Sequence, residues 1–584
     1  MIPVLPSAKA DGYAERAPDG SGLECLLAGA LLTVAVVAIV VRLLGAVGML
    51  TTPVLVGVLV AAAIGATIVL RARGISWRLP WRRAVSLETS PLLAVATAAT
   101  ALAIAAAYLL PGWQWDALGY HLPYVNFALQ RGTFADIPDD VAYLSTYPHI
   151  VEYAFIAWRA LLPDDRLVEL AHIPFGLLGA LAIATIARRQ GARTDHAVAA
   201  GVAWLTLPAV FLQLPTNYTD VASSALLLTA AAFVLGPMDR TRILLAGVAI
   251  GLFLGSKPQA PIATVLLLLV LAVRAYRAGF RAVIPVAGFI AFLLGAESYL
   301  VNVVRHGNPV WPVRFSLGPI DLPGTTGMSE LLQSGGATVA RARGNMFERV
   351  AESWTALVPP YAVFDMRIGG LGLLFLVALP IAVVRAVRAR SPAIAVVAVA
   401  SLATPDPAVA RYILAFPGLV LAMAVPAVEA LGSRARFVVF GVAAVIAAHN
   451  LVVAYPGLSG NGPPLTAYVS MTSAQRQRAV GADGPATAYL DAIAEVRPGE
   501  IAVFDRSAEF PYLAWPFDLS HAAARIPDDV TVEQAGRIVE AADVRMLIVG
   551  DDTITGSVVR RNPQRFIPQF HCKSSSCTVY LRRD

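Results

Sequence analysis

The stretch PGWQWDALGYHLPYVNFALQRGTF covers residues 111–134 and directly follows the apolar segment 88–110. Within it, apolar residues recur at helical spacing, at Leu118, Leu122, Val125 and Leu129. A helix with one apolar face that begins at the end of a membrane-length segment is expected to lie on the membrane surface. The stretch therefore predicts a polytopic membrane protein with a long loop at the water–lipid boundary.

The composition of the whole chain supports this interpretation. Of its 584 residues, 57% are hydrophobic and only 14% are charged, and the mean hydropathy is +0.66. Soluble proteins carry about 25% charged residues, so a soluble enzyme and a disordered chain are both excluded. The net charge of +6 reflects 45 basic against 39 acidic residues. Membrane orientation explains this small excess, and we expect no nucleic-acid partner.

The number of membrane crossings follows from the apolar segments, since a spanning helix needs about 20 apolar residues. About thirteen stretches qualify: 24–50, 53–71, 88–110, 168–187, 196–213, 219–236, 241–255, 259–276, 282–302, 369–387, 392–404, 411–431 and 436–455. Two of them, 241–255 and 392–404, are short. The predicted fold class is an α-helical polytopic membrane protein. The lipid bilayer is therefore a predicted partner.

Arginine in short loops marks the cytoplasmic side of a membrane protein. Six short loops carry it, within 71–83, 188–193, 240–242, 274–281, 385–390 and 434–436. They alternate with loops that are long or acidic, namely 111–167, 214–219, 303–368, 405–410 and the tail from 456. We therefore expect a multi-pass protein of the cytoplasmic (inner) membrane, with its N-terminus inside and its C-terminus outside.

The chain divides into four parts by composition. A polar cytoplasmic N-terminus (1–23) precedes two extra transmembrane helices (24–87) and a core (88–455) with outer loops 111–167 and 303–368. The segment 456–584 is soluble-like, of a typical domain size. Strand-type runs at 500–505, 545–550 and 576–582 surround a helix-type stretch at 530–542. An extracytoplasmic α/β domain is predicted there.

The three cysteines are too few for a cysteine-rich metal site. Cys572 and Cys577 lie close together near the C-terminus, and Cys25 is far away. If the C-terminal domain is outside the cytoplasm, Cys572 and Cys577 are expected to form a disulfide.

Asp116 is the first candidate catalytic residue. It stands a few residues beyond the membrane edge, where its carboxylate could take a proton from a substrate hydroxyl. The alternative is that it caps the following helix and gains from the helix dipole. Tyr120 and His121 follow at one helical turn and could shape the same pocket. Tyr147 and His149, farther along the loop, are further pocket candidates.

A second acidic position lies in the short outer loop LQLPTNYTDVASS. Asp220 opens the next apolar segment, where a charge costs a few kcal/mol unless it is solvated or paired. Asn217 precedes it by one helical turn. Helix capping is again the alternative, but Asp220 and Asp116 are predicted to share the outer face.

Three basic residues are also predicted on the outer face, where membrane orientation disfavours positive charge. Lys257 is one of only three lysines, and it lies in an otherwise apolar stretch. Arg305 and His306 follow another segment, and Arg411 heads a later one. Snorkelling of Lys257 to water is the alternative. A lipid-linked phosphate or pyrophosphate would explain all three cations.

Five motifs in order, WDALGYHLPYV, TNYTD, GSKPQ, HGNPVWP and RYILAFPG, carry a family resemblance over residues 88–430. The chain resembles the integral-membrane GT-C glycosyltransferases, in the branch of the protein O-mannosyltransferases and the lipid A aminoarabinose transferase. The resemblance implies a polyprenyl-phosphate sugar as donor. It assigns Asp116 as the base or orienting acid, Asp220 as a second acid, and Lys257 and Arg411 as phosphate ligands. Ala117 departs from the protein O-mannosyltransferase pattern, which has an acidic residue there.

The expected activity is transfer of a sugar from this donor to an acceptor hydroxyl on the outer face, with inversion by a single displacement, for cell-envelope glycan or glycolipid assembly. The acceptor is left open among glycan, lipid and protein. No nucleotide cofactor is needed. A divalent cation between Asp116 and Asp220 is left open, although two carboxylates are few ligands for such an ion. The alternatives are a transporter or lipid flippase, which would place polar residues at the bilayer midplane, and a scaffold with an external binding domain.

Overall fold

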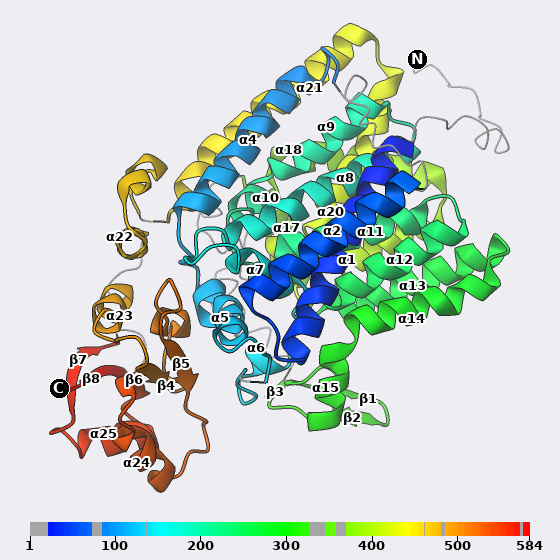
Figure 1. Ribbon diagram of the computed structural model, residues 1–584. Helices are drawn as coiled ribbons and strands as arrows, with labels where there is room; N and C mark the ends of the chain where they lie inside the picture. The colour runs from blue at the N-terminus through cyan, green and yellow to red at the C-terminus, as the bar shows by residue number, and fades with distance from the viewer. Residues whose placement is uncertain are drawn as a thin grey trace.

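The computed structural model describes residues 21–583, except 73–84, 136, 328–344, 358–368, 461, 481–484 and 573–575. Most of the polar N-terminus predicted over 1–23, the arginines between 73 and 83, and parts of the outer loop 303–368 therefore lie outside the described residues. Where the chain is described, it forms a helical bundle with a smaller sheet domain beside it (Figure 1).

Each predicted apolar stretch contains helix. The bundle consists of α1 (Ser21–Ala46), α2 (Thr52–Ala72), α4 (Ser90–Leu109), α8 (Ile173–Arg189), α9 (Thr194–Leu205), α10 (Pro208–Gln213), α11 (Asp220–Leu235), α12 (Arg240–Leu254), α13 (Ala260–Arg277), α14 (Ile284–Gly295), α15 (Glu297–His306), α18 (Gly372–Ala389), α19 (Pro392–Ser401), α20 (Ala415–Ala424) and α21 (Ser433–Ala454). The α-helical polytopic fold class is confirmed.

The predicted count of about thirteen spans is not confirmed. Six described helices are long and apolar enough to cross a membrane, or seven if the bent pair α14–α15 forms one span. The stretch predicted at 196–213 is broken into α9 and α10 because Pro208 forces Leu207 into an extended backbone. The stretch predicted at 282–302 bends by 67° between α14 and α15.

The arginine-rich segments meet at one end of the bundle. Glu24 of α1 pairs with Arg189, at 2.8 Å, and with Arg242. Glu88, just before α4, pairs with Arg436 at 3.1 Å and with Arg193 at 3.3 Å. These contacts join segments far apart in sequence, as the predicted alternation of loops requires. In Figure 1, α4 and α21, which carry one of these junctions, run side by side.

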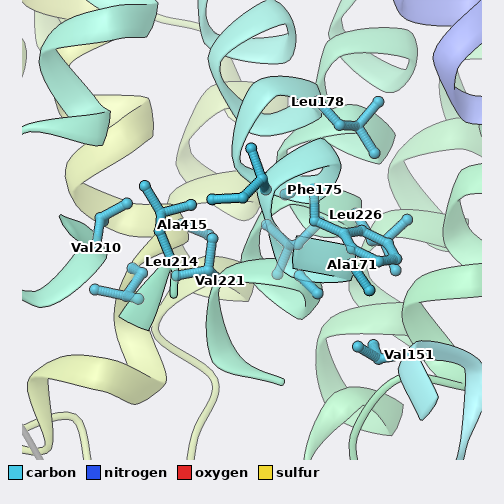
Figure 2. Close-up of a cluster of buried hydrophobic side chains, with 14 of the residues drawn as sticks. Val151, Ala171, Phe175, Leu178, Val210, Leu214, Val221, Leu226 and Ala415 are labelled. Carbon is cyan, nitrogen blue, oxygen red and sulfur yellow. The ribbon is translucent and has the colours of Figure 1, made fainter. Parts of the chain in front are cut away.

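The core of the bundle surrounds α11, most of whose side chains are buried. Figure 2 shows Val221 and Leu226 of α11 among Phe175 and Leu178 of α8, with Ala415 of α20 nearby. The close approach of α20 needs Gly418, because a Cβ there would lie 2.9 Å from side-chain atoms of Ile183 and Leu228. Small residues permit such contacts between membrane helices.

The first outer loop is helical. It contains η1 (Ala117–His121), α5 (Leu122–Gln130), α6 (Ala142–Ser145) and α7 (Ile150–Arg159), and it leads through η2 (Glu169–His172) into α8. The helix predicted after Asp116 therefore forms, but the prediction that its apolar face contacts lipid is wrong. Leu118, Leu122 and Val125 of that face are buried in the protein core. Phe127, on the opposite side of α5, is buried against Phe504 and Trp515 of the C-terminal domain.

The second outer loop holds a small sheet in the order β2-β1-β3, formed by β1 (Val313–Leu317), β2 (Ile320–Leu322) and β3 (Thr326–Gly327). It ends in α17 (Met346–Thr355). The sheet follows α15 directly, and Figure 1 shows it beside that helix.

The C-terminal domain is built on a five-stranded sheet in the order β5-β4-β6-β8-β7. Its strands are β4 (Ile501–Phe504), β5 (Ala522–Arg525), β6 (Val544–Gly550), β7 (Phe566–His571) and β8 (Cys577–Arg582). Its helices are α22 (Ser473–Ala479), α23 (Pro485–Ile493), α24 (Val532–Glu540) and α25 (Ile554–Arg560). The three predicted strands and the predicted helix are confirmed, while β5, β7 and α25 had no clear sequence signal.

Side chains of this sheet alternate between two cores, as the period of a strand requires. Met546 and Ile548 of β6 belong to the core shared with the bundle, whereas Leu547 and Val549 face the core under α24 and α25. The predicted disulfide between Cys572 and Cys577 is present. Both faces of the sheet are thus covered, which is the α/β arrangement.

Candidate active site

Four residues predicted from the sequence form one ion-pair network. Arg411 donates through Nη1 to Asp116 Oδ2 at 2.9 Å, and the same nitrogen lies 3.7 Å from Asp220 Oδ2. Lys257 forms an ion pair with Asp220. Two carboxylates and two cations from four separate parts of the sequence are therefore joined by successive ion pairs. They lie at the end of the bundle opposite the arginine-rich end.

The local structure explains how these side chains are positioned. Asp116 precedes η1 but makes no side-chain cap to it, and Asp220 is the first residue of α11, whose N-cap position is Thr219. The alternative in which both acids serve as helix caps is therefore not borne out. Lys257 lies between α12 and α13 with only 13% of its side chain exposed, so it points to Asp220 instead of snorkelling to water.

A buried histidine fixes the loop that carries Asp220. His172 Nδ1 lies 2.9 Å from the carbonyl of Gln213, and its Nε2 accepts from the backbone N–H of Ala222 at 3.1 Å. These two bonds determine the tautomer, with the proton on Nδ1. The loop between α10 and α11 is thereby anchored to the start of α8.

Two tyrosines enclose the cations. The guanidinium carbon of Arg411 lies 4.8 Å from the ring centre of Tyr218 and 5.2 Å from that of Tyr412. Lys257 Nζ lies 5.1 Å from the ring centre of Tyr412. Such cation–π contacts stabilise a positive charge in a partly desolvated place.

The surroundings lower the pKa of both Asp116 and Lys257, which favours the charged form of the acid and disfavours that of the amine. Burial raises the pKa of Asp116, but the charges of Arg411 and His121 outweigh it, so its pKa is lowered overall. Burial lowers the pKa of Lys257, and the charge of Asp220 opposes this shift only in part. Asp116 is therefore a carboxylate of weak basicity as long as Arg411 contacts it.

The other loop candidates form a supporting layer around Asp116. The ring of Tyr120 stacks on Tyr143 at 5.1 Å and meets Tyr147 edge to face at 6.4 Å. His121 Nδ1 lies 2.7 Å from Glu152 Oε1, and His149 Nδ1 lies 3.7 Å from the same oxygen. Burial raises the pKa of Glu152, but the hydrogen bond with His121 and the nearby ring of His149 bring it to about 2.

The remaining candidates are placed differently. Asn217 is fully buried, and neither its amide oxygen nor its amide nitrogen bonds to any described residue. Arg305 is exposed in the last turn of α15, and His306 stacks on Trp311 at 4.3 Å. Among the described contacts, none joins Arg305 or His306 to the network of Asp116 and Arg411.

A divalent cation fits this network poorly. Asp116 and Asp220 are both already paired with cationic side chains, and two carboxylates are few ligands for a hard cation. Among the described residues, the grouping with metal-ligand spacing is Glu88, Asp195 and His196, at the opposite end of the bundle. There too the carboxylates pair with Arg193 and Arg436.

Sequence reasoning missed several residues that now belong to the site. Tyr218 and Tyr412 are close in sequence to predicted residues, but an aromatic ring near a membrane segment most often has only a packing role. Glu152 and His172 gave a better signal, since each is a titratable residue within an apolar stretch. Their partners come from distant segments, so the pairing itself had no sequence signature.

The arrangement is suited to binding an anion beside an acid–base group. Lys257 and Arg411 offer ammonium and guanidinium donors, and the latter can bind phosphate oxygens in a bidentate manner. The carboxylate of Asp116 shares Arg411 with that anion site. Lys257 and Arg411 could thus bind a leaving phosphate while Asp116, beside them, accepts a proton from a reacting hydroxyl.

Comparison with solved structures identifies the fold. The apo crystal structure of ArnT from Cupriavidus metallidurans superposes with a TM-score of 0.51 at 14% identity, over 84% of this chain and 96% of that chain. The same protein bound to undecaprenyl phosphate gives a TM-score of 0.53 at 15% identity, over 84% and 97% of the two chains. No protein-family model matches, and no curated protein sequence matches. The chain thus has the fold of GT-C membrane glycosyltransferases, which confirms the resemblance at the level of fold.

Proposed function

We propose that the protein is a membrane glycosyltransferase that transfers a sugar from a polyprenyl-phosphate donor to an acceptor hydroxyl, with inversion at the anomeric carbon. The observation that carries the proposal is Arg411, whose guanidinium lies between Asp116 and Asp220 in a network that also contains Lys257. This network joins an anion-binding pair to a carboxylate on one face of the protein.

The residues divide the reaction between them. The acceptor oxygen attacks the anomeric carbon, the bond from that carbon to the phosphate oxygen breaks, and the hydroxyl proton passes to Asp116. Polyprenyl phosphate leaves with the electron pair of the broken bond. Lys257 and Arg411 stabilise its growing negative charge, which is the electrostatic contribution expected to dominate in such sites.

Arg411 links the two halves of this step. While it contacts Asp116, the pKa of that carboxyl is lowered, which makes the carboxylate a weak base. When a donor phosphate binds to the guanidinium, Arg411 interacts less strongly with Asp116. The pKa of Asp116 then rises, and its carboxylate becomes a stronger base. Donor binding would therefore activate the base that accepts the proton.

Two further observations support the donor and the location. ArnT from Cupriavidus metallidurans, which shares the fold, has been crystallised with undecaprenyl phosphate, a lipid of the proposed carrier class. The arginine-rich end of the bundle suits the cytoplasmic side, which supports an outer-face location for the network and the C-terminal domain. The acceptor would be an envelope glycan, lipid or protein.

The direct test uses the purified full-length protein and a panel of polyprenyl-phosphate sugars that differ in the sugar. The expected result is transfer, or slow donor hydrolysis, with at least one donor, and its loss in Asp116→Asn. Asp139→Asn, the same change at an exposed position of the same loop, is the matched control and should remain active. An active Asp116→Asn variant, or no donor consumption by the wild type, would contradict the proposal.

A further inference from the structure

A cleft of about 540 Å³ separates the first outer loop from the C-terminal domain. One wall is formed by Trp115, Gly119 and Tyr120 around η1, together with Tyr143 of α6. The other wall is the loop that follows β4, from Asp505 to Pro511. Its volume lies within the range of about 300–1,000 Å³ typical of ligand pockets.

The topology of the sheet explains why the loop after β4 forms a cleft wall. β4 runs parallel to β5 on one side and to β6 on the other, so the chain reverses its direction of travel across the sheet at β4. In open α/β sheets, ligands bind outside the carboxyl ends of the strands at such a switch point. Asp505 holds this loop in place, because it accepts from the backbone N–H groups of Ser507 at 2.8 Å and Gly550 at 2.9 Å.

The two walls are held in a fixed relation by contacts on either side of the cleft. Trp515 Nε1 donates to Gln130 Oε1 at 2.9 Å, and the hydroxyl of Tyr512 donates to Asp165 Oδ2 at 3.0 Å. Arg525, in the cleft wall, forms an ion pair with Asp140 at 2.9 Å. These bonds make the C-terminal domain part of the same structural unit as the outer loop.

The lining offers flat aromatic faces and polar groups together. The ring of Trp115 is 54% exposed, and Tyr143 adds a ring that is 45% exposed and stacked on Tyr120. Opposite them, the guanidinium of Arg506 is exposed and forms no ion pair with any residue whose position is described. Ser507 and Glu509 add a hydroxyl and a carboxyl group, and burial raises the pKa of the Glu509 carboxyl.

This combination suits a sugar ring. The C–H face of a pyranose carries small positive charges and packs on the negative face of an aromatic ring. Its hydroxyls are both donors and acceptors, so they pair with guanidinium, hydroxyl and carboxyl groups. A lipid tail would desolvate the Arg506 guanidinium without offering it a partner, at a cost. An extended peptide would be expected to pair along a strand edge, whereas the edge strand β5 contributes its last residue, Arg525, to the lining of this cleft.

The cleft adjoins the candidate active site through the backbone. Trp115 precedes Asp116 directly, and Gly119 and Tyr120 belong to η1, at whose start Asp116 stands. Asp116 does not itself line the cleft, but in the sequence it is next to Trp115 and one helical turn from Gly119 and Tyr120.

We propose that this cleft binds the carbohydrate of the acceptor and presents its hydroxyl to Asp116, so that the C-terminal domain selects a glycan acceptor. The inference rests on the proposed glycosyltransferase function. It assigns Trp115 and Arg506 to acceptor binding, while Lys257 and Arg411 serve the donor.

The test measures binding and turnover separately on the full-length protein in detergent. An array of defined oligosaccharides is the binding probe, with unglycosylated peptides and phospholipid vesicles as the other arms. The variants are Arg506→Ala, Arg506→Glu and Trp115→Ala. Arg537→Ala is the control, since Arg537 is an exposed arginine of α24 outside this cleft. Donor hydrolysis in the absence of acceptor is measured on the same preparations.

The expected result is oligosaccharide binding by the wild type and Asp116→Asn, weakened at least tenfold in Arg506→Glu and Trp115→Ala, while Arg537→Ala keeps both the oligosaccharide binding and the donor hydrolysis of the wild type. Absence of oligosaccharide binding, binding unchanged in all three cleft variants, or binding only of peptides or vesicles would overturn the inference. If the wild type binds oligosaccharides through this cleft but uses no donor, the cleft assignment stands and the proposed transferase function fails.

Discussion

Arg411 Nη1 lies 2.9 Å from Asp116 Oδ2, although 295 residues separate the two in sequence. The contact joins the start of η1 to the segment before α20, and it brings the proposed base and a proposed phosphate ligand into direct contact. A charge-assisted bond of this kind is stronger than a neutral one. It also means that any change at Arg411 alters the ionisation of Asp116.

Arg411→Ala is therefore expected to have two effects. Loss of the guanidinium should lower kcat/KM by about 10²–10³-fold, the range for removal of one donor from a developing anion. It should also raise the pKa of Asp116, since Arg411 lowers it. The acid limb of the kcat/KM profile reports the free enzyme, so it should move to higher pH. Transfer rates measured across the acid range check this, with Arg537→Ala as the control; an acid limb that stays in place would argue against Asp116 as the titrating base.

Lys257→Ala should separate donor binding from stability. Asp220 is buried and would keep only the more distant Arg411 as its cation. Removing one partner of a buried pair costs about 3–5 kcal/mol, so thermal unfolding in detergent should shift to lower temperature. In the double variant Lys257→Ala with Asp220→Asn, the uncompensated charge is gone, so stability should recover while donor affinity stays weak. Recovery of donor affinity in the double variant would show that Lys257 acts only by neutralising Asp220.

How much of this site could be predicted depended on how isolated each charge was in the sequence. Lys257 and Asp220 stood out because few charges occur in apolar segments, and the alternation of arginine-rich loops with the other loops placed them at one face. Tyr218 and Tyr412 could not be separated from packing aromatics by any local pattern. The pairing of Glu152 with His121 needed the packing of α7 against α5, which no spacing of residues encodes.

The fold shows the same limit. Apolar stretches predicted nearly every helix of the bundle, and Pro208 would have justified dividing α9 from α10. The pattern of Leu118, Leu122 and Val125 predicted an amphipathic helix correctly. It could not tell whether lipid or protein covers the apolar face, because both are equally apolar. In the structure protein covers it, since Leu118, Leu122 and Val125 are buried in the core, while Phe504 and Trp515 of the C-terminal domain pack on Phe127 at the opposite side of α5.

Glu152→Gln tests the supporting layer through the pH dependence of stability. The pKa of Glu152 is about 2 in the folded protein against 4.5 as the ordinary value. A depressed carboxyl pKa stabilises the fold above the unfolded pKa, and this contribution is lost as the pH falls through the folded pKa. We expect Glu152→Gln to lower the unfolding temperature at neutral pH, with the two proteins converging as the pH falls from about 4.5 toward 2.

Thermal unfolding in detergent at a series of pH values measures this difference. Glu533→Gln is the matched control, because Glu533 is an exposed glutamate whose ion pair with Arg537 lies on the surface. A constant difference between wild type and Glu152→Gln over the whole acid range would show that Glu152 acts by packing, and not through its charge.

The disulfide between Cys572 and Cys577 predicts a thiol count and a loss of stability. Cys25 is the free cysteine, so the denatured, unreduced protein should show one thiol, and the reduced protein three. The bridge closes a short loop, with a sequence separation of 5. Loop-closure entropy then gives about 2 kcal/mol of stabilisation, and Cys572→Ser with Cys577→Ser should lower the unfolding temperature of the C-terminal domain. Because disulfides persist in oxidising compartments, protein purified without reductant that shows three free thiols would contradict both the bridge and the outer location of this domain.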